Sequence, residues 1–322
     1  MTGGPLVVGL DVGGSTTRVL LADLDGTVLG AARGEGGNPV SHGAAAAVRA
    51  VGDTVRRALA EAGADPARVA SGVIGLAGGS VAGGALDVLW PGLGLGCRPA
   101  LVGDAELAYT AGTFAPDGSV LIAGTGAVAA ECRAHTPVRT ADGHGWLLGD
   151  LGSGFWLGRA AVANALTAID RADGGPLAGL AAAVVEALAG PLPAAANPRT
   201  AVIAAAHAHA PVHLAKLAPL VLRRAAEGDP DATALVERAA GHLLDTLATV
   251  REPGSRRPIV LAGGVLTPDT PLTAAVRTRV TARWPDAALH PAGDPAGAAA
   301  WLAARELGRA DERLHTALTR AR

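Results

Sequence analysis

The 322-residue sequence contains a single lysine, Lys216, and this scarcity excludes two ways of binding a nucleotide. A P-loop places its lysine directly after a glycine-rich loop, whereas no glycine occurs in residues 210–215. The strand lysine of protein kinases, in a Val-Ala-Ile-Lys context, is absent as well. Any nucleotide phosphates must therefore be held by backbone N–H groups, hydroxyls and a metal ion.

Cysteine, aromatic residues and net charge are also low. The two cysteines, Cys97 and Cys132, are far apart and form neither a disulfide framework nor a zinc site. The longest uncharged stretch, residues 69–86, contains six glycines and predicts a strand and a loop rather than a membrane span. No signal peptide is recognisable at the N-terminus. With a net charge of −2, the sequence predicts a cytoplasmic protein that binds neither nucleic acid nor a membrane surface.

The first forty residues predict a three-stranded meander. Residues 6–10 form a short apolar run, a Gly-Gly-Ser-Thr-Thr turn follows, and residues 18–22 and 27–30 resume the strand pattern around an Asp-Gly turn. A dinucleotide-binding fingerprint would need a helix after its glycines and a G-x-G-x-x-G spacing, and both are missing.

Residues 41–117 predict alternating helices and strands. Ser41 is a candidate N-cap for a helix that ends near Gly63. Strands are expected at residues 69–76, with a glycine loop behind them, and at residues 100–103. A helix follows directly after Asp104. The Asp117-Gly118 pair then marks a domain boundary.

Beyond this boundary the strand, glycine turn and strand recur. Residues 119–123 lead into Gly124-Thr125-Gly126, and residues 127–131 form the next strand. Two copies of this strand–turn–strand unit predict two related halves that face each other. Helices are expected over most of residues 153–250, then a strand at 259–262, a helix, a strand at 288–290 and a last helix from about Pro295.

Asp11 and the turn at Gly13–Thr17 form the first candidate site. Glycines in a tight turn let backbone N–H groups approach an anion, and Thr16 adds a hydroxyl. A carboxylate beside bound phosphates can hold hydrated magnesium. The same residues are equally consistent with an ordinary hairpin and a solvated aspartate.

Two further glycine turns and one aspartate are also candidates. Gly124–Gly126 could grip phosphates opposite the first turn, and Gly263-Gly264 could admit a flat nucleotide base. Asp104 lies at the end of a strand and before a helix, where a carboxylate can take a hydroxyl proton during phosphoryl transfer. A helix N-cap is the other interpretation of Asp104.

The glycine-rich loop 142–156 contains three of the eight aromatic residues. A sugar ring needs an apolar platform and fixed hydroxyl partners, which Trp146 and Asp150 could supply. Phe155 and Trp156 are interpreted instead as core residues of the following helix.

Three histidines close together in sequence, His207, His209 and His213, do not predict a metal site. Their spacings of two and six do not share a helix face, and Pro211 interrupts them.

Taken in order, the motifs resemble the BadF/BadG/BcrA/BcrD ATPase family. This family includes N-acetylglucosamine kinases and actinobacterial glucosamine kinases, and it belongs to the actin, heat-shock and sugar-kinase superfamily. The resemblance covers most of the chain, with its most specific part around Trp146. The segments that carry it are residues 9–17, 103–106, 121–126 and 143–150.

The resemblance implies an α/β fold of two ribonuclease-H-like, actin-like ATPase domains, with ATP and a sugar meeting in the cleft between them. The expected domain I comprises residues 1–117 and a C-terminal helix at about 293–322. Domain II would span residues 118–292 and carry helical insertions.

The resemblance also implies roles for individual residues. Asp11 would act on magnesium through water, and Asp104 would take the proton of the sugar 6-hydroxyl. The ATP-binding set would be Gly13, Gly14, Ser15, Thr16, Thr17, Gly124, Thr125, Gly126, Gly263 and Gly264. The sugar-binding set would be Asn38, Asp104, Gly145, Trp146 and Asp150.

Two departures from the family pattern bear on the substrate. Relatives that phosphorylate N-acetylglucosamine often carry Gly-Thr-Gly-Ser-Asn, whereas residues 124–128 here are Gly-Thr-Gly-Ala-Val. Many members have glutamate where this chain has Leu151. We therefore expect an ATP- and magnesium-dependent glucosamine kinase that forms glucosamine 6-phosphate and ADP, with N-acetylglucosamine kinase as the alternative.

Two other classes and the oligomeric state remain open. An ATPase that activates a redox enzyme through an iron–sulfur cluster would need cysteines placed to bridge subunits, and Cys97 and Cys132 lack that context. A non-catalytic sugar sensor would bind sugar without ATP turnover. The expected ligands are an amino sugar and ATP, and a homodimer is one assembly compatible with the sequence.

Overall fold

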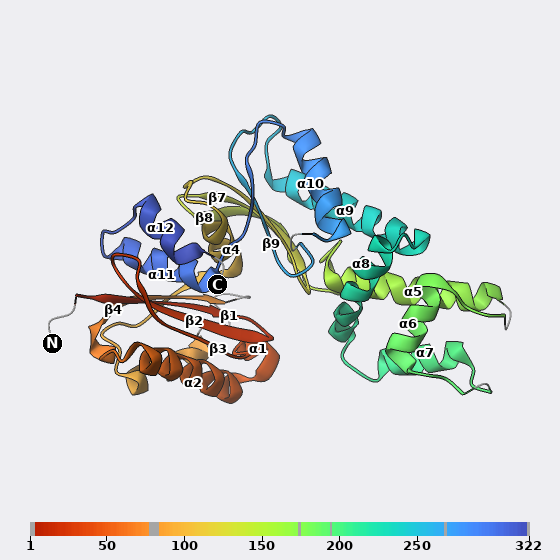
Figure 1. Ribbon diagram of the computed structural model, residues 1–322, viewed down its shortest axis with the longest axis horizontal. Coiled ribbons are helices and arrows are strands. Elements are labelled where there is room, and N and C mark those ends of the chain that lie inside the picture. The colour runs from red at the N-terminus through yellow and green to blue at the C-terminus, as the bar shows by residue number, and fades with distance from the viewer. Residues whose placement is uncertain (1–3, 77–83, 173–174, 194, 267–268, 321–322) are drawn as a thin grey trace. The chain divides into compact units, whose positions relative to one another are not determined.

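Two five-stranded sheets organise the chain, one in each of two units (Figure 1). The computed structural model describes residues 4–76, 84–172, 175–193, 195–266 and 269–320. Unit 1 comprises Met1–Pro116, Ala134–Thr136 and Ala292–Arg322, and unit 2 comprises Asp117–Arg133 and Pro137–Pro291. The glycine loop expected behind residues 69–76 lies at 77–83, outside the described residues.

The sheet of unit 1 has the order β3-β2-β1-β4-β5. The first three strands form the expected antiparallel meander, and β4 and β5 extend it in parallel on the other side of β1. Strand β1 is almost wholly buried, as its apolar run predicts. The strands are β1 (Leu6–Val12), β2 (Thr16–Asp23), β3 (Val28–Glu35), β4 (Val69–Leu76) and β5 (Ala100–Gly103).

Helices cover both faces of this sheet (Figure 1). Helix α2 packs on β2 and β3, and α11 packs on β1 and β4. Gly9 makes the second contact possible, because a Cβ there would lie 2.0 Å from the Ala296 carbonyl oxygen. The helical segments of unit 1 are α1 (Pro39–His42), α2 (Ala44–Ala62), η1 (Pro66–Arg68), η2 (Gly84–Leu86), η3 (Trp90–Leu93), α4 (Asp104–Gly112), α11 (Pro295–Glu306) and α12 (Glu312–Thr319).

The start of the first long helix differs from the expectation. Ser41 does not cap it, because residue 41 lies within the short helix α1 and Gly43, at φ 78°, separates α1 from α2. Asn38 caps α1, since its side chain accepts a hydrogen bond from the Val40 N–H at 2.9 Å, and α2 begins after Gly43 without a side-chain cap. The expected end of this helix is correct, since Gly63 is the C-cap of α2, and the helix buries Val51 and Val55 in the core.

The sheet of unit 2 has the order β10-β9-β6-β7-β8. When β6 is aligned with β1, this order is the same as that of unit 1, and the antiparallel glycine turn falls between corresponding strands. The repeated strand–turn–strand unit in the sequence therefore marks two halves of one topology. The strands are β6 (Gly118–Ala123), β7 (Ala127–Arg133), β8 (Thr136–Asp142), β9 (Ile259–Ala262) and β10 (Leu289–Pro291).

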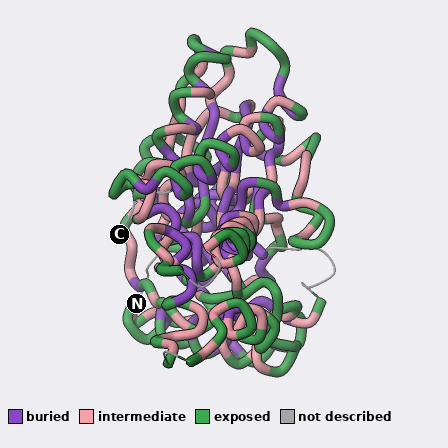
Figure 2. Tube along the Cα trace, turned by 90° about the vertical axis from the view of Figure 1, so that its right-hand side faces the viewer, coloured by how far each residue is buried: buried purple, intermediate pink, exposed green. Residues whose placement is uncertain are grey.

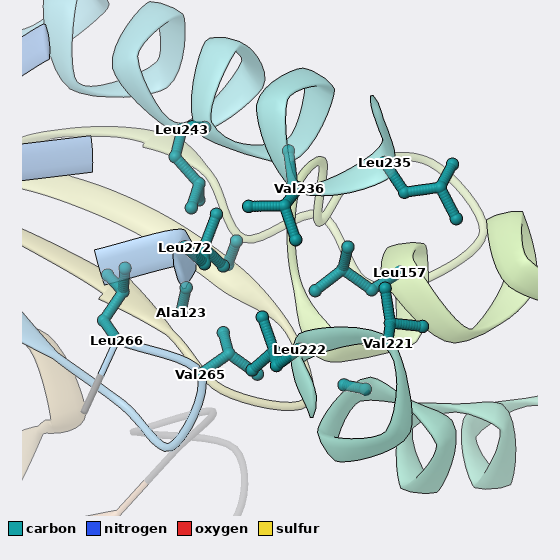
Figure 3. Packing of buried hydrophobic residues seen from close by; sticks show 14 of the residues in the cluster. Ala123, Leu157, Val221, Leu222, Leu235, Val236, Leu243, Val265, Leu266 and Leu272 are labelled. Carbon is teal, nitrogen blue, oxygen red and sulfur yellow. The ribbon is translucent and has the colours of Figure 1, made fainter. Parts of the chain in front are cut away.

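Helices make up most of the rest of unit 2, as predicted for residues 153–250. Their buried leucines and valines, such as Leu157, Val236 and Leu243, join β6 in one apolar cluster (Figure 3). Figure 2 colours the chain by burial, and its helical turns carry both buried and exposed segments. The helical segments are α5 (Gly154–Ala172), α6 (Gly179–Ala189), α7 (Pro198–His207), η4 (Pro211–Leu217), α8 (Ala218–Ala226), α9 (Pro230–Val250) and α10 (Pro271–Arg283).

Among the described residues, the helices are too short or too polar for any of them to cross a membrane.

Candidate functional site

The β1–β2 turn of unit 1 presents two backbone donors that find no acceptor among the described residues. Gly13 donates its N–H to the Thr16 carbonyl at 2.9 Å, which closes the turn. The N–H groups of Gly14 and Ser15 donate to no acceptor within the described part of the chain, and both residues are exposed. Adjacent outward-facing N–H groups form an anion-binding concavity, so the turn can receive a phosphate.

Thr17, expected among the ATP-binding residues, does not share this exposure. It pairs with Val12 in the sheet, and its side chain is fully buried. Within the described residues its hydroxyl has no hydrogen-bond partner. The physical reason for the departure is strand alternation, which turns residue 17 inward when residue 16 faces the turn. The Thr17 hydroxyl is therefore not exposed at the turn beside the N–H groups of Gly14 and Ser15.

Asp11 lies on β1 one position before its end, where three other charged groups influence it. Partial burial raises the pKa of its carboxyl group, and the Arg18 guanidinium, at 3.1 Å, opposes that shift. The carboxylates of Asp294 and Asp104 raise the Asp11 pKa further by repulsion. Negative charge is thus concentrated at this end of β1 without a full set of cationic partners.

The donor set at Asp11 fits a hydrated magnesium ion rather than a caged one. Magnesium prefers oxygen ligands, keeps several waters and commonly uses one or two carboxylates plus substrate phosphates. Asp11 provides a carboxylate, and no group of three or more potential metal ligands occurs in the described residues. The raised pKa of Asp11 is consistent with a carboxyl group that a cation would help to ionise.

Asp104 is the first residue of α4, directly after β5. Gly103 takes the N-cap position, so the structure does not make Asp104 the cap. The Asp104 Oδ1 accepts a hydrogen bond from the Ala105 N–H at 2.9 Å. The side chain reaches solvent, yet nearby protein atoms partly dehydrate it, and this desolvation raises its pKa. An accessible carboxyl group with a raised pKa is suited to general-base chemistry.

Asn38, expected to hold sugar hydroxyls, has a structural role in α1. It is 5% exposed, and its Oδ1 forms the cap described above. The contact with a sugar stays a prediction.

In unit 2 the Gly124–Gly126 turn is anchored by the start of α5. The N–H groups of Gly154 and Phe155 donate to the carbonyls of Gly124 and Thr125, at 2.8 and 3.1 Å. These bonds hold the carbonyls toward the helix. Meanwhile, the N–H groups of Thr125 and Gly126 find no acceptor among the residues that the structure describes. Each unit therefore has a glycine turn with two such donors.

The Gly263-Gly264 turn lies against the Gly124–Gly126 turn. Gly263 has φ +96°, and a Cβ at this position would lie 2.2 Å from the Ala123 carbonyl oxygen. The Val265 N–H donates to that oxygen at 3.2 Å. Two glycine segments far apart in the sequence are thus in backbone contact.

A cavity of about 700 Å³ adjoins the Gly263-Gly264 turn within unit 2. Leu266, which lines it, donates its N–H to the Gly263 carbonyl at 3.0 Å. Thr270, the N-cap of α10, and Arg277, in the middle of the same helix, also line the cavity. Its volume lies in the range of small-molecule sites.

Asp150 links the glycine-rich loop 142–156, called the sugar loop below, to the Gly124–Gly126 turn. Its side chain is 8% exposed, and its Oδ1 accepts a hydrogen bond from the Ala127 N–H at 3.0 Å. Burial raises the Asp150 pKa, the bond from Ala127 lowers it, and the Asp142 carboxylate raises it again. In turn, Asp142 accepts the N–H groups of Asp150 and Leu151, at 2.6 and 3.0 Å, and so closes the loop.

Trp146 lies in the closed loop with much of its ring in solvent. It is 42% exposed, and its ring centroid is 5.5 Å from that of Phe155. Phe155 is buried and Trp156 packs against the helical core, as the sequence predicted for both. Gly145 has φ +82°, and the space around a Cβ there is open. The loop therefore offers an aromatic face and room beside it.

Sequence reasoning missed three charged residues. Arg18 pairs with Asp11, Asp142 closes the loop, and Asp294 caps α11 through the Ala296 N–H at 2.9 Å. The Asp-Pro pair that begins α11 is a helix-start signal that could have drawn attention to Asp294. The roles of Arg18 and Asp142 depend on pairings that only the folded chain defines.

Comparison with known proteins gives one family match. The model of the BadF/BadG/BcrA/BcrD ATPase family matches residues 8–303, which is most of the chain and includes every site residue described above.

Solved structures with the same two-domain architecture are numerous. A proposed N-acetylglucosamine kinase from Chromobacterium violaceum is 28% identical, with a TM-score of 0.72 over 93% of this chain and 99% of that one. A proposed N-acetylglucosamine kinase from Porphyromonas gingivalis is 20% identical, with a TM-score of 0.65 over 89% and 93%. A ROK family glucokinase from Streptomyces griseus, in complex with glucose and AMPPNP, is 19% identical, with a TM-score of 0.52 over 94% and 98%.

Proposed function

The chain belongs to the BadF/BadG/BcrA/BcrD ATPase family, and from this premise we propose that it is a kinase for an amino sugar. It transfers the γ-phosphoryl group of ATP to the sugar 6-hydroxyl. The proposal is carried by the glycine turn of each unit, whose N–H groups have no acceptor within the described ranges, together with the accessible carboxyl group of Asp104, whose pKa is raised. These are the parts that a lysine-free phosphoryl transfer requires.

Asp104 is the proposed general base. Its carboxylate takes the proton from the sugar 6-hydroxyl while the bond from that oxygen to the γ-phosphorus forms and the bond from this phosphorus to the bridging oxygen of ADP breaks. A base typically contributes about 10²–10⁴-fold to the rate. The raised pKa of Asp104 favours this role, because it makes the carboxylate a better proton acceptor.

The glycine turns are the proposed phosphate ligands. In unit 1 the proposed donors are Gly14 and Ser15, and in unit 2 they are Thr125 and Gly126. Backbone donors fixed before the substrate binds need no reorganisation during the reaction. When bound, magnesium would offset phosphate charge, and Asp11 would hold it through a water molecule.

The cavity beside Gly263 and Gly264 is the proposed nucleoside site. Leu266 supplies an apolar surface for a flat base, and Thr270 and Arg277 supply polar groups at its edge. An apolar pocket with a few polar groups is typical of cofactor and nucleotide sites.

The loop around Trp146 is the proposed sugar site. The exposed ring would form an apolar platform, with Gly145 leaving room for the sugar. Asp150 would act mainly by fixing the loop to the glycine turn. In unit 1, Asn38 and Asp104 are the residues that we propose as sugar contacts.

Glucosamine is the proposed substrate because of Val128. Its side chain contacts Gly143 at the base of the sugar loop, since a Cβ on Gly143 would lie 3.1 Å from Val128 Cγ2. An apolar residue there offers no hydrogen bond to an acetamido group, where N-acetylglucosamine kinases of this family often carry asparagine. N-acetylglucosamine is the second candidate. The names of the structures from Chromobacterium violaceum and Porphyromonas gingivalis favour it.

The redox-activator alternative is disfavoured by the cysteines. Cys132 is fully buried in β7, and Cys97 is partly buried. Neither position presents a thiolate for a cluster shared between subunits.

The decisive experiment is a coupled assay of ADP release with glucosamine, N-acetylglucosamine, glucose and mannosamine. We expect turnover with amino sugars, highest with glucosamine, and we expect Val128→Asn to raise kcat/KM for N-acetylglucosamine relative to glucosamine. Val138→Asn serves as the matched control, because Val138 is an exposed valine of β8 that belongs to none of the proposed sites. Faster turnover of glucose than of glucosamine and N-acetylglucosamine would overturn the substrate assignment.

A further inference from the structure

A second cavity, remote in sequence from the site residues above, lies among the helices of unit 2. It has a volume of about 660 Å³ and is enclosed by α6, α7, η4 and α8. This volume is within the range of small-molecule sites. None of its lining residues belongs to the glycine turns, the sugar loop or the nucleoside cavity, so the inference is independent of the proposed function.

The floor of the helical cavity is apolar. Leu188, Leu214 and Leu220 are half-buried and pack against the main core of unit 2, and Leu217 is buried in that core. Alanines of α7, among them Ala205 and Ala206, complete the floor and leave the cavity open because their side chains are small. The cavity thus exposes a concave apolar surface continuous with the core.

The rim of the cavity is cationic. It carries Lys216, the only lysine of the chain, and Arg223, and both are exposed. His209 and His213 lie beside them, with ring centroids 5.3 Å apart. Among the residues that the structure describes, no aspartate or glutamate lines the cavity.

The two permanent cations of the rim are not neutralised internally. Neither Lys216 nor Arg223 forms an ion pair with a carboxylate anywhere in the described ranges. The neighbouring Arg224 is different, because it pairs with Glu227 and Asp229. Charge complementarity at the rim therefore calls for an anion from outside this part of the chain.

We propose that the helical cavity binds a small amphipathic anion, a ligand with a carboxylate or phosphate head group on an apolar body. The apolar body would fill the floor of leucines and alanines. The head group would lie between Lys216, a compact mobile charge, and Arg223, whose planar guanidinium binds oxyanions in a bidentate manner. The imidazoles of His209 and His213 can donate further hydrogen bonds to the same oxygens.

Isothermal titration calorimetry on the full chain tests the proposal, with octanoate and octyl phosphate as probes below their micelle concentrations. Octanol tests the apolar body without a charge, and inorganic phosphate tests the charge without an apolar body. We expect octanoate and octyl phosphate to bind. Octanol and inorganic phosphate should each have a dissociation constant at least tenfold higher, because the loss of one charged hydrogen bond changes affinity by about that factor. The stronger of the two anions identifies the preferred head group.

Variants locate the binding in the cavity. Lys216→Gln and Arg223→Gln should each weaken binding about tenfold, because each removes one charge-assisted contact from an exposed side chain without disturbing the core. Arg171→Gln is the matched control, since Arg171 is an exposed arginine of unit 2 outside the cavity. Leu188→Gln should weaken octanoate while leaving inorganic phosphate unchanged.

Three results would overturn the proposal. One is equal affinity for octanol and octanoate, which would make the site merely apolar. Another is unchanged binding in Lys216→Gln and Arg223→Gln, which would place the probe elsewhere. The third is sedimentation showing a dimer that these two variants dissociate, because the face would then belong to a second copy of the chain. Sugar phosphorylation is measured separately, and its failure leaves these outcomes unaffected.

Discussion

Asp150 Oδ1 accepts the backbone N–H of Ala127 at 3.0 Å and thereby joins the sugar loop to the glycine turn between β6 and β7. The bond is buried, and Asp150 holds it from a left-handed backbone conformation at φ 57°. Two segments proposed to bind different substrates are therefore fixed to each other through one carboxylate.

Asp150→Ala should loosen both segments. It leaves the Ala127 N–H unpaired, which typically costs about 1–3 kcal/mol, and it should raise KM for the sugar. Asp150→Asn is the matched variant, because an amide oxygen can still accept the bond and asparagine tolerates positive φ. Urea unfolding and the hydrogen exchange rate of the Ala127 amide measure the effect. Equal unfolding free energies for the two variants would refute this role of Asp150.

Asp104→Asn should separate catalysis from folding. Turnover should fall by about 10²–10⁴-fold, while ATP binding stays largely intact, because the variant removes a base and not a phosphate ligand.

The same Asp104→Asn variant should be more stable than the parent protein near neutral pH. Since the folded state raises the Asp104 pKa, ionisation opposes folding as pH rises above 3.8, the ordinary value. Single-turnover kinetics and thermal unfolding at pH 7 test the two effects, and full activity would contradict the assignment.

Gly263 and Gly264 should respond very differently to alanine. Gly263→Ala forces a Cβ against the Ala123 carbonyl oxygen and strains a backbone at φ +96°, so we expect a loss of at least about 2 kcal/mol of unfolding free energy. Gly264→Ala meets open space and should stay within about 0.5 kcal/mol of the parent. Chemical unfolding checks both, and a tolerated Gly263→Ala would mean that the turn can shift.

His315 should make the stability of the protein sensitive to mild acid. It is 5% exposed, and its Nε2 lies 2.6 Å from the Thr110 carbonyl oxygen. Burial lowers the His315 pKa below its ordinary value of 6.5, so the unfolded chain binds the proton more readily than the folded one. The stabilisation is complete above pH 6.5 and is lost as pH falls below it.

The measurement for His315 is thermal unfolding between pH 5 and pH 8. His315→Gln should flatten the acid limb of this profile, whereas His207→Gln should leave it unchanged, because His207 is exposed on α7. An acid limb that survives His315→Gln would assign the sensitivity to other groups.

Trp146→Ala should affect sugar binding more than folding. The ring is 42% exposed, and its aromatic contact with Phe155 is worth about 0.5–1.5 kcal/mol. We expect KM for the sugar to rise while KM for ATP changes little, and we expect Trp146→Phe to restore most of the sugar affinity. An equal rise in both KM values would indicate a general disturbance of the loop.

The sequence by itself was sufficient for the architecture. Alternation and apolar runs placed strands such as residues 69–76 and 100–103 at their observed bounds, because local burial patterns follow strand geometry. The repeated glycine turn revealed two related halves, which the two sheets confirm by their identical strand order. Tight turns and short strands depend on neighbouring residues, so a single chain read in order is informative about them, whereas the predicted start of the first long helix at Ser41 was wrong.

Only the tertiary structure decided which groups act on one another. Strand alternation in the folded sheet buries Thr17, and the repulsion of Asp294 acts on Asp11 across 283 positions of sequence (294 − 11). The packing of four helices leaves the Lys216 rim without a carboxylate among the residues that the structure describes. Such relationships depend on distances between residues far apart in the chain. Charge and burial act through space, and no local pattern carries that information.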